Sequence, residues 1–522
     1  YAQLRFAEDT ADPRRGAFMQ QIQTRLTQIQ NRVIFFQVAW TKLDEAIAVR
    51  WLSNPSIESE RHFLENARKF APYTLSEAEE KILSLKSNTS NLAFCRLFDE
   101  TLNQIPFTIR LAGKTHKKTE AQILSLQHDS RRTVRKSAAQ SLGAGLIGQT
   151  RLLTYVYNMI LADHRLSMQL RNWRHPMEPM NLYNEIDLES VESLIRSVQE
   201  AYPLVSRYYR LKKKLLRLDQ FCDYDRHAPI GADTACVPWK EACGIVLESL
   251  RQFSPEALAC AKPFFERGWI DAEIRPGKQG GGFCCATTPE LHPYILINYT
   301  GSMRDVLTLA HEIGHGIHQS LSAQAGILQM HAPLTLAETA SVFGEMLAFD
   351  RLLAVCKSPR QKLALLCDKI DDNFATVFRQ VAITDFELAC HRASAAQGEL
   401  AADQISNFWV EANRRMYQKS VVLTKTFPHG WKYISHIIHS PFYCYAYSFA
   451  QLVVLTLYQK YRQDPAGFVP GYFKMLSLGG SDKPDRIAAA AGLDLKAPDF
   501  WKSGLKLLEG YVLEAERLAS SV

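Results

Sequence analysis

The chain has 522 residues, of which 47% are hydrophobic and 22% charged, and its formal net charge is +7. These proportions are typical of globular proteins and exclude a disordered chain. Apolar runs such as residues 452–455 are far shorter than the roughly 18 residues that a membrane-spanning helix needs, so we do not expect a membrane protein.

Apolar residues recur at helical spacing through the first half of the chain. The pattern predicts helices over residues 18–52, 75–105, 133–164, 188–218 and 240–265. Within the last range, Ser254 and Pro255 form a favourable N-cap and first-turn pair. We expect an N-terminal helical region, residues 1–129, and a helical body, residues 130–522. The first residues lack both an initiator Met and the apolar stretch of a secretory signal, so we expect the true start to be missing.

The residue pattern changes between residues 269 and 301, where short β-like runs occur together with a glycine cluster and three prolines. This composition predicts a small sheet with strands near residues 270–275 and 294–299. From residue 302 onward the helical pattern resumes. Because proline interrupts helices, we expect breaks near Pro333, Pro359, Pro428, Pro441 and Pro470.

Basic residues gather in two small clusters, at 131–136 and at 212–214. Such a modest excess in a chain of this length is more typical of solvated helix faces than of a nucleic-acid interface. We therefore expect no nucleic-acid partner.

The eleven cysteines are odd in number and irregularly spaced, and they include the adjacent pair Cys284 and Cys285. Neighbours in sequence do not readily form an ordinary disulfide. This usage predicts reduced thiols and a cytoplasmic protein.

The segment "SMRDVLTLAHEIGHGIHQS" predicts a helix that begins with a capping pair, Ser302 and Asp305. His311 and His315 are four residues apart, so their rings project side by side, as two nitrogen ligands of a tetrahedral zinc ion would. Glu312 is next to the first ligand, where it can reach a water molecule on the metal rather than the metal itself. The HExxH pattern thus predicts a zinc site with Glu312 as general base.

The alternative is a core helix with two hydrogen-bonded histidines. Gly314 and Gly316 argue against it, since each glycine inside a helix costs about 1 kcal/mol relative to alanine. A close approach of backbone or substrate would explain them.

A catalytic zinc needs a third protein ligand and one open position. Glu338 follows His315 by 23 residues and lies on a second expected helix, residues 332–353. No histidine occurs at the spacing of the three-histidine signature, which favours Glu338. Two alternatives stay open: Thr335 and Glu338 also form a capping-box pattern, and His318 is a more distant competitor on the first helix. Glu345 either orients a ligand histidine or is a surface charge.

These motifs resemble a known family. "PYILINYTGSMRDVLTLAHEIGHGIH" followed by "LAETASVFGE" resembles the oligoendopeptidase F branch of the thimet-oligopeptidase zinc metallopeptidases. The likeness extends to "RYYRLKKKLL", "GKQGGGFCC" and "WKYISHIIHSPFYCYAYSFA" and covers at least residues 130–455. It implies a mainly α fold: a large, ellipsoidal helical shell around a deep substrate channel, with a small antiparallel sheet beside the zinc helix.

By position, the resemblance implies that His311, His315 and Glu338 hold one Zn²⁺ per chain and that Glu312 is the general base. It also places His436 and neighbouring tyrosines near the substrate carbonyl, where an imidazole or phenol would stabilise the oxyanion.

Three tyrosines follow His436 in this segment. Tyr443 and Tyr447 would share a helix face and are the expected catalytic pair, whereas Tyr445 would point elsewhere and is expected to bind substrate. Packing of these rings within the protein is an equally open alternative.

Gly280, Gly281 and Gly282 match the glycine-rich loop of the family, which lies beside the substrate strand. Backbone without side chains can lie against an extended peptide. A hairpin turn without substrate contact is the alternative.

The predicted function is that of a zinc-dependent endopeptidase for short oligopeptides in the cytoplasm. A dipeptidyl carboxypeptidase-type exopeptidase is the first alternative, but it would need a fixed cation for the substrate carboxylate, and no residue stands out for that role. A catalytically silent peptide-binding protein is the second, and the intact Glu312 argues against it. The oligomeric state stays open.

Overall fold

The computed structural model describes residues 1–231 and 236–521, and it is mainly α-helical, as predicted. Its contacts divide the chain into two compact units. Unit 1 comprises Tyr1–Glu80, Thr234–Val355 and Leu457–Leu495, and unit 2 comprises Lys81–Asp233, Cys356–Thr456 and Lys496–Val522. The expected boundary between residues 129 and 130 stays a prediction.

Unit 1 contains the sheet β3–β5 and most of the helices that surround it. Its helices are α1 (Ala2–Glu8), α2 (Pro13–Lys42), α3 (Glu45–Leu52), α4 (Arg61–Arg68), α13 (Trp239–Phe253), α14 (Pro255–Glu266), α15 (Met303–Ser322), α16 (Leu334–Ala337), α17 (Thr339–Val355), α23 (Pro465–Ser477) and α24 (Pro484–Ala489). Its strands are β3 (Ile270–Asp271), β4 (Phe283–Cys285) and β5 (Tyr294–Leu296).

Unit 2 is a helical body with one β-hairpin. Its helices are α6 (Asn91–Gln104), α7 (Glu120–Leu126), α8 (Arg132–Gly148), α9 (Thr150–Arg171), α10 (Glu178–Tyr183), α11 (Leu188–Glu200), α12 (Tyr202–Leu215), α18 (Pro359–Thr376), α19 (Phe378–Gln397), α20 (Ala402–Tyr417), α21 (His436–His439) and α25 (Phe500–Ala519). The hairpin strands are β1 (Phe107–Leu111) and β2 (Lys114–Lys118), and the boundary between the units falls within α5 (Glu77–Ser87) and α22 (Tyr445–Gln463).

The predicted helical ranges are confirmed, but several are divided into two helices by local caps. Within the range 18–52, one helix ends at Lys42 and the next begins after Asp44. The Asp44 carboxylate accepts hydrogen bonds from two amides of the following turn. Ser254 caps α14 as predicted, accepting from the amide of Glu256 at 3.1 Å, with Pro255 in the first turn. Local side-chain acceptors thus set these boundaries.

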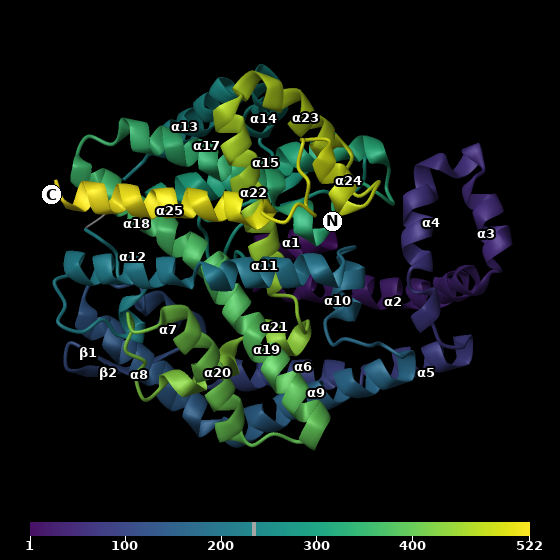
Figure 1. The fold of residues 1–522 in the computed structure, drawn as a ribbon, viewed down its shortest axis with the longest axis horizontal. Helices are drawn as coiled ribbons and strands as arrows, with labels where there is room; N and C mark the ends of the chain where they lie inside the picture. The colour runs from purple at the N-terminus through teal and green to yellow at the C-terminus, as the bar shows by residue number, and fades with distance from the viewer. Residues whose placement is uncertain (232–235, 522) are drawn as a thin grey trace. The chain divides into compact units, whose positions relative to one another are not determined.

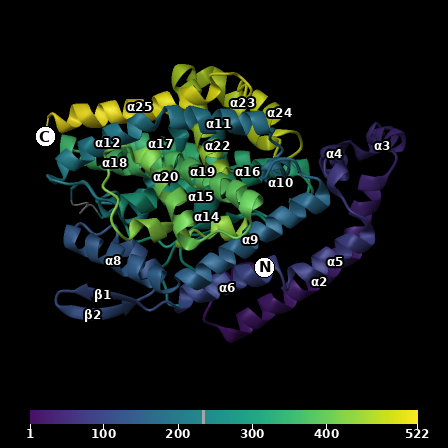
Figure 2. The same ribbon diagram turned by 60° about the horizontal axis from the view of Figure 1, so that its bottom comes forward.

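The small sheet lies beside α15, as expected, and its strand order is β3–β5–β4. Strand β4 pairs with β5 in the expected antiparallel sense, while β3 joins the other edge of β5 in parallel. Strands β3 and β5 are shorter than predicted. The pattern also left out β4 and the hairpin β1–β2, which lies against α8 in Figure 2.

The expected break at Pro470 is wrong, because this residue lies inside α23. Proline removes one helical hydrogen bond, but aromatic packing on both sides of it holds the helix. Phe468 and Tyr472 stack on Phe343 of α17 with ring centroids 5.6 and 4.6 Å apart. Tertiary packing therefore outweighs the local penalty.

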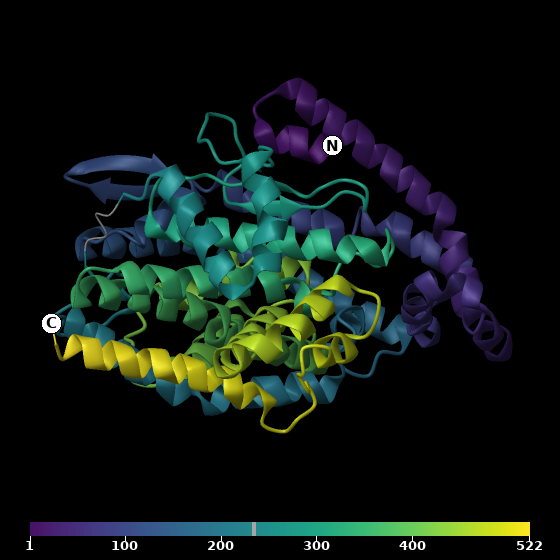
Figure 3. The ribbon, with the colours of Figure 1, turned by 90° about the horizontal axis from the view of Figure 1, so that it is seen from above.

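In Figure 1, helices α13, α14, α15 and α17 gather in one part of unit 1. Helices α18 and α25 of unit 2 run side by side in the same view. Figure 3 shows α1 folded back on the first part of the long helix α2. The chain around α1 also holds the glycine loop of unit 1: the Gln279 amide donates to the Ala7 carbonyl at 2.8 Å, and the Thr10 amide to Gly277 at 2.7 Å.

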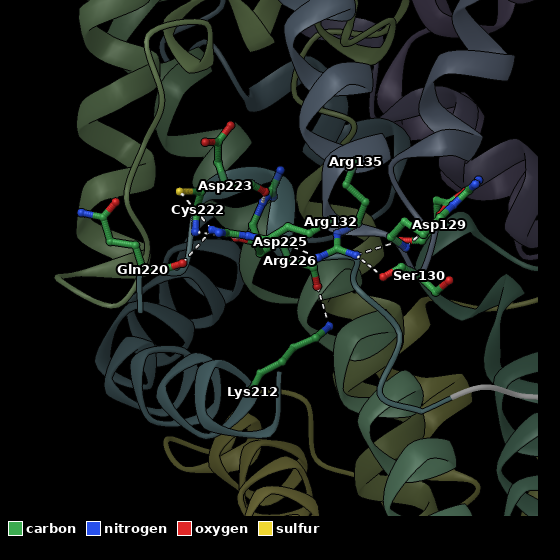
Figure 4. Close-up of polar contacts among 11 residues, drawn as sticks. Asp129, Ser130, Arg132, Arg135, Lys212, Gln220, Cys222, Asp223, Asp225 and Arg226 are labelled. Atoms are coloured by element: carbon green, nitrogen blue, oxygen red, sulfur yellow. Dashed lines mark hydrogen bonds and ion pairs between the residues drawn. The ribbon is translucent and has the colours of Figure 1, made fainter. Parts of the chain in front are cut away.

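The basic clusters noted in the sequence contribute to structural ion pairs. Asp225, fully buried in unit 2, accepts from Arg132 at 2.9 Å and from Arg135 at 3.0 Å (Figure 4). Lys212 forms an ion pair with Asp371 and donates to the carbonyl of Arg226. Because an unpaired buried charge would be costly, these pairs fix α8 to the segment that carries Asp225 and α12 to α18, which carries Asp371.

Among the described residues, no helix combines the length and the apolar character that crossing a bilayer requires. All eleven cysteines are free thiols, in agreement with the expectation from their spacing.

Candidate metal centre

Helix α15 begins with the predicted capping box. The Ser302 hydroxyl accepts from the Asp305 amide at 3.2 Å, and the Asp305 carboxylate accepts from the Ser302 amide at 3.1 Å. The apolar face of the helix, which includes Val306 and Ile313, is buried in the core of unit 1. This anchoring presents His311 and His315 on a neighbouring face, with ring centroids 4.9 Å apart.

Glycines bring α15 and α17 into direct backbone contact. A Cβ atom on Gly314 would lie 2.2 Å from the carbonyl oxygen of Ala340, and one on Gly344 would lie 2.9 Å from that of Ala310. A Cβ atom on Gly316 would collide with the ring of Phe264 at 2.6 Å. The close approach predicted at the two helical glycines is therefore made by the backbone of α17 at Gly314 and by the ring of Phe264 at Gly316.

We expect Gly314→Ala to destabilise the protein, because backbone atoms cannot move aside as a flexible side chain could. The loss of unfolding free energy should be about 1–3 kcal/mol, as for other overpacked cores, and should be measured by urea denaturation. Gly244→Ala is the matched control, since a Cβ atom in that helix meets nothing within 4 Å. It should stabilise α13 by up to about 1 kcal/mol. Equal effects of the two substitutions would contradict the packing argument.

Glu338 lies at a break between α16 and α17, where a single continuous helix was expected. Its carboxylate Oε2 is 3.3 Å from His311 Nε2 and 3.4 Å from His315 Nε2, and it accepts from the Ser341 hydroxyl at 2.6 Å. The alternative capping box with Thr335 does not form. The Thr335 hydroxyl is buried and has no hydrogen-bond partner in the part of the chain that the structure describes, and the residue that caps α16 is Pro333.

The donor atoms of His311, His315 and Glu338 fit a tetrahedral zinc ion. All three lie within 4.8 Å of one another. With zinc–ligand distances near 2.0–2.2 Å, two ligand atoms of a tetrahedron are about 3.3–3.6 Å apart. The two histidine–carboxylate distances match that spacing, and the set of two nitrogens and one oxygen is one that catalytic zinc uses.

The electrostatics of the cluster favour a cation. Burial lowers the pKa of His311, but Glu338 and Glu345 outweigh burial and raise it to about 10. Burial raises the pKa of Glu338, yet the two histidines hold it well below its usual value. Glu345 lies 3.5 Å from Nδ1 of His311, which is the position of a carboxylate that orients a ligand histidine.

His318 does not join the three ligand atoms. Its side chain is buried, and burial followed by the charge of His315 lowers its pKa to about 4. It lies one turn beyond the donors and lines the same cavity.

Glu312 faces the same cavity as the three donors and is only 5% exposed. Its Oε2 atom has no hydrogen-bond partner among the described residues. Burial raises the pKa of its carboxyl, and the charges of the two histidines lower it in part. A buried carboxylate with a vacant acceptor atom beside a cation site is arranged to accept a proton from a reacting group.

The glycine loop contributes one residue to this cavity of about 340 Å³. A Cβ atom on Gly282 would lie 3.2 Å from Oε1 of Glu312, so a side chain would crowd the carboxylate. Gly281 has a φ of +82°, and a Cβ atom on it or on Gly280 would meet nothing within 4 Å. The structure thus brings Gly282 to the cavity, while Gly280 and Gly281 shape the loop before β4.

Two further residues of the cavity wall are not among the site residues that the sequence predicts. Gln319 and Cys284 both line it, and the Cys284 thiol lies 3.4 Å from the Gln319 side-chain oxygen. The spacing of Gln319, four residues after His315, was the available signal.

The predicted His and Tyr residues form a cluster of their own in unit 2. His436 Nε2 lies 3.0 Å from the Tyr447 hydroxyl, and its ring stacks on Tyr443 at 5.5 Å between centroids. The rings of Tyr443 and Tyr447 are 5.2 Å apart, but they do not share a helix face as predicted, because Tyr443 precedes α22, which begins at Tyr445.

Tyr445 differs from its neighbours. It is fully buried, and its hydroxyl accepts from the Asn184 side chain at 2.9 Å. Burial raises the pKa of its phenol. Tyr445 is thus a core residue of unit 2, in place of the expected substrate contact.

Comparison with family models identifies two segments of the chain. A model described as peptidase family M3 matches residues 252–507, which include the cluster in unit 1 and the His and Tyr residues of unit 2. A model described as oligopeptidase F matches residues 40–107. The second match lies upstream of residue 130, where sequence reasoning found only helical character.

Relatives with assigned names match over most of the chain. An oligoendopeptidase F homolog of Lactococcus lactis subsp. lactis is 23% identical over 99% of this chain and 86% of its own length. The oligopeptidase PepF of Bacillus subtilis is 25% identical over 88% of this chain and 69% of its own length.

Solved structures share the fold. A candidate peptidase from Chlamydophila abortus superimposes with a TM-score of 0.89 and 25% identity, over 99% of this chain and 87% of that one. The oligoendopeptidase-F of Enterococcus faecium gives a TM-score of 0.79 and 21% identity, over 100% of this chain and 90% of that one.

Proposed function

This chain belongs to peptidase family M3, in its oligoendopeptidase F branch, and from that premise we propose that it is a zinc-dependent endopeptidase that hydrolyses short oligopeptides. The observation that carries the proposal is the triangle of His311, His315 and Glu338 beside the buried, partly unpaired carboxylate of Glu312. The three donors would hold one zinc ion per chain, and Glu345 would orient His311.

Zinc held by these donors would supply Lewis-acid chemistry, polarising the scissile carbonyl and making a water molecule more acidic. Glu312 takes the proton from that water as its oxygen attacks the carbonyl carbon. The same carboxyl then gives the proton to the amide nitrogen as the carbon–nitrogen bond breaks. The products are one new carboxylate and one new amine, and Glu312 returns to its starting form.

Gly282 helps to keep this carboxylate accessible. Because a side chain at that position would lie 3.2 Å from Oε1 of Glu312, glycine leaves room for a substrate backbone next to the base. Strand β4, which follows directly, is at the edge of the sheet and would pair with an extended peptide.

His436 and one of Tyr443 and Tyr447 are proposed as donors to the oxyanion that forms at the carbonyl. This role rests on the sequence resemblance and on the cluster that the three side chains form, in which His436 is hydrogen-bonded to Tyr447 and both rings contact Tyr443. Burial lowers the pKa of His436, with Arg379 and His439 adding to the effect. A neutral imidazole can accept the proton of one phenol or donate its own, which keeps the cluster's donors oriented.

The proposed compartment is the cytoplasm, on the basis of the eleven free cysteines. Free thiols on a chain of this kind persist where glutathione and thioredoxin keep cysteines reduced.

A peptide blocked at both ends tests endopeptidase action. We expect cleavage of an N-acetylated, C-amidated peptide of about ten residues at an internal bond, read by mass spectrometry, with Glu312→Gln prepared in parallel as the blank. The same peptide with a free C-terminus should be cut at the same bond. Release of dipeptides only from the free C-terminus would contradict the proposal and favour an exopeptidase.

A further inference from the structure

A strained turn precedes the two tyrosines of unit 2. The Ser440 carbonyl accepts from the Tyr443 amide at 3.0 Å, so residues 440–443 form a β-turn with Pro441 and Phe442 at its centre. Phe442 has a φ of +62°. Proline followed by a residue of positive φ is the pattern of a type II turn, in which the second central position is normally glycine. A bulky residue keeps this conformation only when its surroundings hold it.

Two contacts hold Phe442 in place. Its ring is fully buried against His391, with centroids 4.6 Å apart. Its amide, which takes no part in the turn's own hydrogen bond, donates to Oε1 of Glu387 at 2.9 Å. Glu387 belongs to α19 and is itself 0% exposed.

Among the described residues, no cation balances the Glu387 carboxyl. No lysine, arginine or histidine in the described part of the chain forms an ion pair with it, and its Oε2 atom has no hydrogen-bond partner there. The titratable groups that face it are Tyr157 of α9, Cys390 of α19 and Cys444 beyond the turn. Burial raises the pKa of Glu387 to about 8, and the bond from Phe442 lowers it only in part. A buried acid of this kind is costly, which is unusual for a residue that only packs.

The turn sets the direction of the segment that carries the proposed oxyanion donors. Tyr443 is its last residue, and α22, which carries Tyr447, begins two residues later at Tyr445. Tyr447 reaches the His436 ring at 3.0 Å, and Tyr443 stacks on the same ring. A change in the turn would therefore move both phenols relative to His436.

We propose that Glu387 is a positioning residue for the reaction: by accepting the Phe442 amide it holds the 440–443 turn, and so places Tyr443 and Tyr447 against His436. The inference rests on the proposed donor role of these side chains. It concerns unit 2 alone and adds a residue, from a different helix, that touches neither substrate nor metal.

Two substitutions of Glu387 separate its acceptor from its charge. Glu387→Gln keeps an oxygen acceptor for the Phe442 amide, and we expect its kcat to stay within about threefold of the parent at pH 7. Glu387→Leu fills the same space without an acceptor, and we expect kcat to fall at least tenfold with KM and zinc content unchanged. Asp385→Leu is the matched control, because Asp385 is a buried carboxylate of the same helix that binds Gln199 instead of the turn. Its kcat should be retained.

A double-mutant cycle connects the loss to the tyrosines. Tyr443→Phe and Tyr447→Phe are measured first, to find which phenol donates. In the background of that variant, Glu387→Leu should lower kcat less than threefold further, because the misplaced donor is already absent. Full additivity, or unchanged kcat in Glu387→Leu alone, would overturn the inference. Unchanged kcat in both tyrosine variants would instead overturn the proposed donor role.

The pH dependence of stability is a second readout. Since burial raises the pKa of Glu387 above the value of an exposed carboxyl, the folded chain holds this proton at pH values where the unfolded chain has lost it. Raising the pH toward 8 therefore favours unfolding. Glu387→Gln removes this loss of stability at higher pH. The Tm of the variant minus the Tm of the parent should therefore increase between pH 5 and pH 8. A Tm difference that stays constant with pH would contradict a buried, uncompensated carboxyl.

Discussion

Replacing Glu312 with glutamine is expected to lower kcat by on the order of 10²–10⁴, the range that a positioned general base contributes. Glutamine has the same shape but cannot take a proton from water or pass it to the leaving amine. Because Glu312 lies beside the donor triangle without belonging to it, the variant should still bind one zinc ion per chain. Metal analysis and a quenched-fluorescent peptide assay on the same preparation measure both quantities.

Glu345→Gln is the comparison that isolates this role. Glu345 is also a carboxylate near His311, at 3.5 Å from Nδ1, but it is proposed only to orient the ring. Loss of such an orienting group typically weakens metal binding or activity by about 10–100-fold. At saturating zinc, Glu345→Gln should therefore regain most of its kcat, whereas Glu312→Gln should not. Turnover by Glu312→Gln at the parent rate would remove Glu312 as the base.

Loss of the metal, or of its carboxylate donor, is expected to abolish peptide hydrolysis. A chelator should inactivate the parent protein, and added Zn²⁺ should restore it. Mg²⁺ should not, because it prefers a shell of oxygen ligands and water. Glu338→Ala removes the only carboxylate of the donor triangle and should weaken zinc binding by more than about 100-fold, beyond the effect of an orienting group.

Glu338→Ala has a structural control in Ser341→Ala. Ser341 donates to the same carboxylate oxygen at 2.6 Å, so its loss leaves the donor in place and should change zinc affinity only slightly. Circular dichroism should show the same helix content in both variants, since Glu338 lies between two helices. Zinc bound by Glu338→Ala with the affinity of the parent would contradict the proposed ligand set.

Features that depend on short stretches of chain were predicted from the sequence alone. The capping box at Ser302 and the N-cap at Ser254 were found because each acceptor is within three residues of its donor. The side-by-side arrangement of His311 and His315 follows from helical periodicity and needs no other element. The mainly α fold follows in the same way, from long runs with a 3.6-residue period.

Features that depend on packing were predicted incompletely. Strand β4 is only three residues long and is defined by its pairing with β5, so its own sequence does not predict a strand. Pro470 stays within α23 because aromatic rings on both sides of it stack on Phe343. The sequence predicts a substrate contact for Tyr445, but a pattern of alternating tyrosines does not show which phenol has a buried partner such as Asn184.

By itself, therefore, the sequence determined the helix of the proposed zinc site, its two histidines and the proposed base next to them, because all of these lie on one regular element whose geometry is local. Only the tertiary structure decided how Glu338 meets them. The carboxylate comes within 3.3 Å of His311 because α16 ends just before it and because Gly314 and Gly344 let two helix backbones touch. It also decided that Glu387 meets the Phe442 amide, 55 residues away in the chain, since contacts between distant segments follow from packing rather than from periodicity.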